Sequence, residues 1–329
     1  MSIVDVAPLE FDTCDDLLNH IVHNPLWNYS QWIFRGQGNK DHVLLPSVLR
    51  KGMAKNNKYQ IAREWYLLKR FGTYADQQGL KVPYIGEFDK LRPIHQLVRK
   101  CANGEHQWPP SEIHCLMALA QHYGIQTRIL DWTHSPLTGL YFAAQYAVKE
   151  TEPDKSQIEL FALNENISKL YVGAFNKHQQ HMAQIGTVLR VINVPYAGNP
   201  NITAQQGAFT CVIDDGFHPE EPVCPKTIDQ AVIELANAMN DLEDSALEQL
   251  IHHRPLLVKL SAPGYHGKYL LQKLESRFGV NGSSLLPGYH GAFRSVEDLV
   301  YCLGIELDEH AAKDLDFIAS LADRSDHSE

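Results

Sequence analysis

The hydrophobic pattern changes about half-way along the chain, and this change limits the folds that it can adopt. In the first half, apolar residues recur three and four positions apart, which predicts helices at 56–71, 111–123 and 136–149. In the second half, short apolar runs predict strands at 158–163, 187–194, 209–213 and 256–260. Helices followed by strands fit an α+β fold better than alternating parallel βαβ units. We therefore expect an α+β protein with a mixed or antiparallel sheet flanked by helices.

Residues that favour helix ends refine these boundaries. The first helix is expected to end at Gly72, and the Gly- and Pro-rich segment after it, up to residue 110, to be irregular or weakly helical. Ser111 is expected to cap the second helix, and Gly124 to follow its last turn. Ser135, followed by a proline, is a typical start for the third helix. Ser295 is expected to cap the last helix of the chain.

We expect one main domain with a short segment at each end. Residues 1–31 are interpreted as an N-terminal helical cap, whose short helix ends near Pro25. The main domain spans residues 32–305 and includes a helical insert at about 214–253. The composition then turns polar, and residues 306–329 are interpreted as a C-terminal tail.

Composition excludes several classes of protein. A net charge of −10 argues against broad electrostatic binding to nucleic acid, although it leaves room for a local basic pocket. The six cysteines form no CxxC pair, so reduced thiols in a cytoplasmic protein are the simpler interpretation. Acidic residues within the first dozen positions argue against a signal peptide. No run of 18 apolar residues occurs, so we expect no contact with a membrane.

The short segment Phe34-Arg35-Gly36-Gln37-Gly38 is the first candidate for a binding site. It closes the apolar run Trp32–Phe34, which we expect to join the sheet, so Arg35 is expected where the backbone turns. The glycines would let a ligand approach backbone N–H groups, and a guanidinium can bond a phosphate or a carboxylate twice. Gln37 would lie on the same face as Arg35. The alternative is a surface turn in which Arg35 forms a structural salt bridge.

Three later positions carry polar groups at the ends of predicted elements. His122 and Tyr123 end a helix, and Asp131 ends the short extended piece that begins at Arg128 and is followed by Trp132. Gln205 and Gln206 enter a predicted strand beside a glycine. Structural alternatives exist for each: His122 could bond to the next loop, Asp131 could pair with Arg128, and Trp132 could be core. Gln206, whose amide could read another amide or a purine edge, could be a polar pair with its neighbour at a strand edge.

Motifs for other chemistry are missing from the sequence. It holds no HExxH and no Cys/His finger spacing, so we expect no metal site. It also lacks a Walker-type loop, a GxGxxG between strand and helix, and a GxSxG elbow. These absences leave nucleoside triphosphate hydrolysis, Rossmann cofactors and serine hydrolysis unsupported, and no permanently bound cofactor is expected.

The order of these blocks resembles the FRG domain family, named for its phenylalanine (or tyrosine)–arginine–glycine signature. The blocks that carry the resemblance are Phe34–Gly38, Leu119–Ile125 with its His-Tyr-Gly, Thr127–Thr133 with its Leu-Asp-Trp-Thr, Ser135–Leu137 and Ala204–Thr210. The resemblance extends from about Trp32 to about Leu299. Family members also tend to carry an acidic pair near the end of the domain. The corresponding run here is Leu-Leu-Pro-Gly-Tyr-His-Gly, in which His290 takes the place of an acid.

The order of residues suggests an ADP-ribosyltransferase-like fold and an enzyme that acts on a nucleotide, with NAD as the candidate substrate. Arg35 would clamp phosphate, and His122, Asp131 and His290 complete the catalytic candidates. The residues expected to contact the nucleotide are Arg35, Gly36, Gln37, Tyr123, Arg128, Trp132 and Gln206. We expect Arg35, His122, Arg128, Asp131 and Gln206 to converge on one cleft. The alternative is a recognition domain that binds an anionic small molecule or a protein partner, and the acceptor of a transferase, protein or nucleic acid, is left open.

Overall fold

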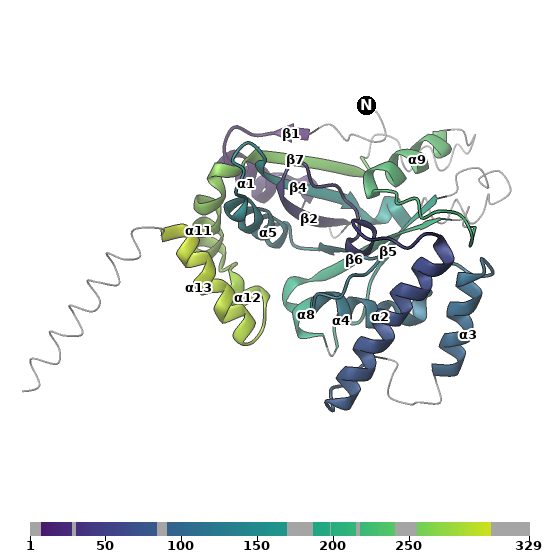
Figure 1. Cartoon of the computed structure of the whole chain (residues 1–329). Coiled ribbons are helices and arrows are strands. Elements are labelled where there is room, and N and C mark those ends of the chain that lie inside the picture. Colours follow the sequence, from purple (N-terminus) through teal and green to yellow (C-terminus); the bar gives the residue numbers. More distant parts are fainter. Residues whose placement is uncertain are drawn as a thin grey trace, which may run out of the picture.

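The computed structural model describes residues 8–27, 31–83, 91–169, 187–197, 199–214, 218–240 and 255–303. Within these residues, seven strands form one sheet in the order β1-β7-β4-β2-β3-β6-β5. The outer strand β1 is parallel to β7, and all the other neighbours are antiparallel. The chain is therefore an α+β protein with a mixed, open sheet, which confirms the predicted class (Figure 1).

The helices and strands lie along the chain as follows. The strands are β1 (Pro8–Glu10), β2 (Trp32–Asn39), β3 (Leu130–Thr133), β4 (Ser156–Asn164), β5 (Thr187–Ile192), β6 (Gly207–Asp214) and β7 (Leu257–Pro263). The α-helices are α1 (Cys14–His23), α2 (Asn57–Gln77), α3 (Leu91–Ala102), α4 (His114–His122), α5 (Pro136–Lys149), α8 (Pro200–Gln205), α9 (Ile228–Asn240), α11 (Gly267–Phe278), α12 (Gly282–Leu285) and α13 (Tyr289–Leu303). None of the described helices is long and apolar enough to cross a membrane.

The sheet is narrow where β2 meets β3. Strand β2 pairs with β4 along nearly its whole length, whereas its register with β3 consists of Phe34 opposite Thr133. Strand β3 in turn pairs with β6 from Leu130 to Thr133. Because β2 and β3 separate beyond Phe34, the sheet has two halves with an opening between them on the side of Arg35 and Asp131.

Helix α5 lies directly on β2 because two residues of that strand have no side chain. A Cβ atom on Gly36 would lie 2.0 Å from the carbonyl oxygen of Gly139, and one on Gly38 would lie 2.1 Å from the backbone nitrogen of Ala147. The helix therefore approaches the strand backbone to backbone, and Phe34 and Leu140 pack in the core between them. This core also holds α1 and α11, whereas α2, α3, α4 and α9 cover a second core on the other face.

Several sequence predictions are confirmed. All four predicted strands of the second half are present, and Trp32–Phe34 joins the sheet. The side chain of Ser135 accepts a hydrogen bond from the Thr138 N–H and caps α5. Gly124 follows α4 with a φ of 84°, in the left-handed region that favours glycine. The short helix predicted near the start of the chain is present as α1, and it ends before Pro25.

Other predictions of local structure were wrong. Helix α2 continues through Gly72, which is buried in the helix. The following segment was expected to be irregular or weakly helical, and α3 shows that part of it is helical. Ser111 begins a 3-10 turn before α4 instead of capping it, and Ser295 lies inside α13, where its hydroxyl accepts a hydrogen bond from Ser283 N–H. In each case tertiary packing outweighs the local preference of one residue. The predicted tail and residues 241–253 of the predicted insert lie outside the described residues.

Candidate functional site

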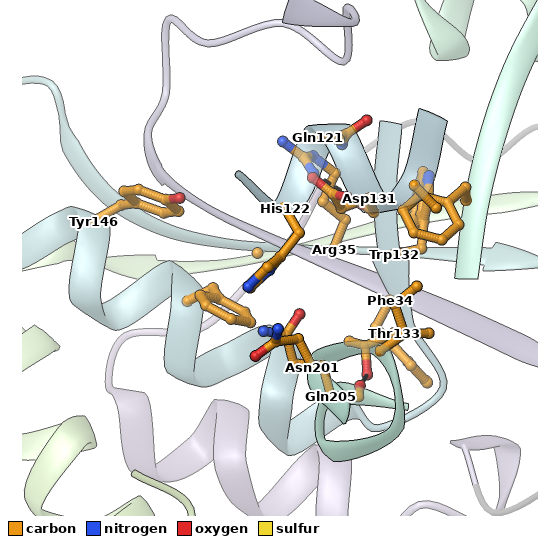
Figure 2. Close-up of a pocket in the computed structure, with 16 residues that line it drawn as sticks. Phe34, Arg35, Gln121, His122, Asp131, Trp132, Thr133, Tyr146, Asn201 and Gln205 are labelled. Atoms are coloured by element: carbon orange, nitrogen blue, oxygen red, sulfur yellow. Dashed lines mark hydrogen bonds between the residues drawn. The ribbon is translucent and has the colours of Figure 1, made fainter. Parts of the chain in front are cut away.

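A cavity of about 240 Å³ lies at the opening between β2 and β3. Its walls come from β2, β3, α4, α5, α8 and the start of β6, so segments far apart in the sequence build it together (Figure 2). Polar groups from several of these elements face it, among them Arg35, His122, Asp131 and Asn201. The cavity thus combines a cation, a carboxylate, an imidazole and amides within a partly apolar wall.

Arg35 occupies the middle of a strand, so the predicted turn at this position was wrong. Its Nη1 donates a hydrogen bond of 2.8 Å to the backbone carbonyl of Asp131 and so joins β2 to β3 where their ladder stops. Its buried Nε has no hydrogen-bond partner among the described residues. Burial lowers the pKa of the guanidinium, which the Asp131 carboxylate partly offsets. The side chain is enclosed by protein yet keeps part of its surface toward the cavity, where an anion would meet it.

Asp131 and His122 supply the other two titratable groups. Asp131 is exposed, and its carboxylate makes no hydrogen bond or ion pair within the described parts of the chain. His122 is the last residue of α4. Burial lowers the pKa of its imidazole, the nearby His290 lowers it further, and Asp131 raises it. His122 is therefore mainly neutral at pH 7 and able to accept a proton.

A known protein family matches the part of the chain that supplies most of the residues lining the cavity. The FRG domain model matches residues 30–152. These residues form an FRG domain. The matched range contains Arg35, His122 and Asp131, whereas α8 and α13, which contribute Asn201 and His290, lie outside it. No curated protein and no solved structure matches the chain.

The glycine of the FRG signature has a structural role that the sequence reasoning did not give it. Gly36 lines the cavity, but its φ is not positive, and the space beside its Cα is filled by α5. Trp132 also lines the cavity, while its Nε1 donates a buried hydrogen bond to Thr210 Oγ1. Much of the indole is therefore core, as the structural alternative for this residue proposed.

Four further residues expected at the site lie elsewhere. Arg128 pairs with the buried carboxylate of Glu64, with 2.8 Å between Nη2 and Oε1, so the prediction that it joins the cleft was wrong. Gln206 was also misplaced, because it is the exposed left-handed residue that ends α8. Tyr123 is 66% exposed and packs against the ring of Phe71. Gln37 is buried in β2 and does not line the cavity.

His290 lies beside the cavity. It is the second residue of α13, and its ring centroid is 6.5 Å from that of His122. No three histidine, cysteine, aspartate or glutamate side chains in the described part of the chain are grouped closely enough to hold a metal ion. The charge of His290 lowers the pKa of His122.

The sequence reasoning missed several groups of the cavity. They are Gln121, Thr133, Phe142, Tyr146 and Asn201, whereas Gln205 was considered with Gln206 but was expected at the entrance of a strand. Phe142 and Tyr146 are four residues apart on α5, and Asn201 and Gln205 are four apart on α8, so each pair shares a helix face. That spacing was visible in the sequence, but α8 was expected to be a strand entrance. Its helical face could not be recognised without the helix.

The pKa of His122 gives a first testable prediction. In an NMR titration of the folded protein, its imidazole should titrate below pH 6.5, because burial and His290 disfavour its charged form. The contribution of His122 to the free energy of unfolding should therefore be complete above pH 6.5. It should decrease as the pH falls through the pKa that His122 has in the folded protein. Replacing His290 by Asn should raise the pKa of His122 without bringing it above its ordinary value. An imidazole that titrates above pH 6.5 in the native protein would contradict this assignment.

Proposed function

We propose that the FRG domain binds a nucleotide in this cavity and cleaves the nicotinamide–ribose bond of NAD, transferring ADP-ribose to an acceptor or to water. The observation that carries the proposal is the meeting of Arg35, Asp131 and His122 at one opening in the sheet. The guanidinium suits the diphosphate, because it stays charged and can bond phosphate oxygens. The carboxylate suits the positive charge that develops on the ribose as the bond breaks.

With water as acceptor, the reaction balances with groups that line the cavity. The C1′–N1 bond breaks and its electron pair leaves with nicotinamide, which departs as a neutral base. The water oxygen bonds to C1′, and its proton passes to the neutral imidazole of His122 and then to solvent. The products are ADP-ribose, nicotinamide and a proton. The lowered pKa of His122 suits this role, because the imidazole is unprotonated at neutral pH.

The size of the cavity limits how NAD would bind. The cavity has a volume of about 240 Å³. That space accommodates a ring with its sugar or part of a diphosphate, and is smaller than the usual range for drug-sized ligands. We therefore propose that the reacting half of NAD occupies the cavity and the adenosine half lies outside it.

Arg35→Ala tests this function. Purified native protein incubated with NAD should release nicotinamide, measured by chromatography, and the variant should release it at least about 100-fold more slowly, because charge-assisted bonds to phosphate are lost. Arg99→Ala, which removes an exposed arginine on α3, should leave the rate unchanged. Native protein that releases no nicotinamide, or an Arg35→Ala variant that keeps its rate, would contradict the proposal.

A second candidate function is recognition of an anionic small molecule without chemistry. The observation that favours it is His290, a histidine beside the cavity where relatives are expected to carry an acid. If the site is an altered transferase, His290→Glu should raise the NAD turnover. If neither the native protein nor His290→Glu releases nicotinamide while calorimetry detects nucleotide binding to both, the recognition function replaces the enzymatic one.

A further inference from the structure

Helix α8 brings two amide side chains to one wall of the cavity. Asn201 and Gln205 are four residues apart, so they lie one above the other on the same face of the helix. Both line the cavity, and Figure 2 places them across it from Gln121 and Asp131, with His122 between. This wall carries no charge, in contrast to the wall formed by Arg35 and Asp131.

The hydrogen bonds already made by these amides leave a defined set of groups for a ligand. Gln205 Nε2 donates to the backbone carbonyl of Leu285 at 3.3 Å, which fixes the amide and leaves Oε1 as an acceptor. Asn201 makes no side-chain hydrogen bond within the residues that the structure describes, so its Nδ2 remains a donor. A donor and an acceptor from neighbouring turns therefore face the same space.

Apolar groups flank this pair. Phe142 of α5, Ile202 of α8 and Phe209 of β6 line the same cavity as the amides. A planar ring can pack between such groups while a polar substituent on the ring reaches the amides. A ring substituent that matches these two amides needs a hydrogen-bond acceptor and an N–H donor on the same carbon atom. A carboxamide is such a group.

We infer that Asn201 and Gln205 are the specificity-determining residues of this site and select a ligand that carries a carboxamide on a planar ring. This inference rests on the proposed function and identifies which half of NAD enters: the nicotinamide. The Asn201 amide donates to the carboxamide oxygen, and the Gln205 Oε1 accepts from its NH₂ group. A ring carboxylate lacks the N–H donor and would set its negative charge against the Gln205 oxygen.

Free nicotinamide and nicotinic acid are the probes for this inference, measured by calorimetry on the full chain. Nicotinamide should bind at least about tenfold more tightly than nicotinic acid. Asn201→Leu, which keeps the number and branching of the side-chain heavy atoms and removes the amide, should weaken nicotinamide binding up to about tenfold. Asn201→Asp provides a near-isosteric second variant that loses the donor and should also weaken it. Gln206→Asn is the matched control, because it shortens an exposed amide at a left-handed position that Asn tolerates.

The outcomes separate this inference from the proposed reaction. Amide-dependent binding of nicotinamide without NAD cleavage would support the inference and overturn the enzymatic function. NAD cleavage with equal kcat/KM for NAD and its nicotinic acid analogue would support the enzyme and overturn the inference. Equal affinity for the two free rings, tighter binding of adenine than of nicotinamide, or unchanged affinity in both Asn201 variants would also overturn it.

Discussion

Gly36→Ala should prevent the chain from folding, or destabilise it by at least about 4 kcal/mol, in the range reserved for the most disruptive single substitutions. The added methyl group would lie 2.0 Å from the carbonyl oxygen of Gly139 and 2.6 Å from the backbone nitrogen of Ala143. Both atoms belong to the backbone of α5, so no side chain can rotate away to make room. The helix would have to leave β2, and the core between them would open. Urea unfolding followed by circular dichroism measures the effect.

Gly79→Ala is the control for this prediction, because Gly79 has a positive φ and open space beside its Cα, whereas Gly36 has no positive φ and a crowded Cα. Gly79 has a φ of 71°, and nothing lies within 4 Å of the position that its Cβ would take. The substitution should therefore cost about 1–2 kcal/mol, the strain of a left-handed alanine. If Gly36→Ala folded with a loss no larger than that of Gly79→Ala, the close contact between α5 and β2 would not be the reason for glycine at this position.

This contact changes how the signature around Arg35 is understood. The sequence suggested a turn whose glycines admit a ligand, because glycine most often serves turns. The structure instead has a strand whose glycines admit a helix on one face, while Arg35 points to the other. The two residue types of the signature thus have complementary structural roles. The glycines allow α5 to lie against β2, and the arginine connects β2 to β3 across the opening.

The class of fold was predictable because the strand and helix periods are local properties of the sequence. Strand order was not, since the link between β2 and β3 rests on residues about 100 positions apart, Phe34 and Thr133. The same limit applies to the cavity. Arg35, His122 and Asp131 could be selected because they end or interrupt local patterns, whereas Asn201 and Gln205 depend on α8, a short helix without a strong apolar period.

Arg128 was expected at the cavity but pairs with Glu64 instead. It precedes β3 in the block that also holds Asp131, so a shared site was a natural hypothesis. Its partner Glu64 lies 64 positions earlier in α2 and is 2% exposed, a burial that no local pattern indicated. Glu64 also accepts hydrogen bonds from Trp108 Nε1 at 2.7 Å and Gln60 Nε2 at 2.9 Å. The carboxylate therefore ties α2 and the segment before α4 to the start of β3.

Glu64→Gln should destabilise the protein by about 3–5 kcal/mol, because it removes the charge that balances the mostly buried guanidinium of Arg128. The double variant Glu64→Leu with Arg128→Met should recover much of this loss, since it removes both charges together. Glu220→Gln is the control: its ion pair with Lys58 is largely exposed, so the loss should stay under about 1 kcal/mol.

Because Arg128 lies two residues before β3, Glu64→Gln should also reduce nucleotide affinity at temperatures where the variant is folded. If Glu64→Gln were no less stable than the double variant, the ion pair between Glu64 and Arg128 would not be what fixes the position of β3. Another contact would then hold Asp131 at the cavity.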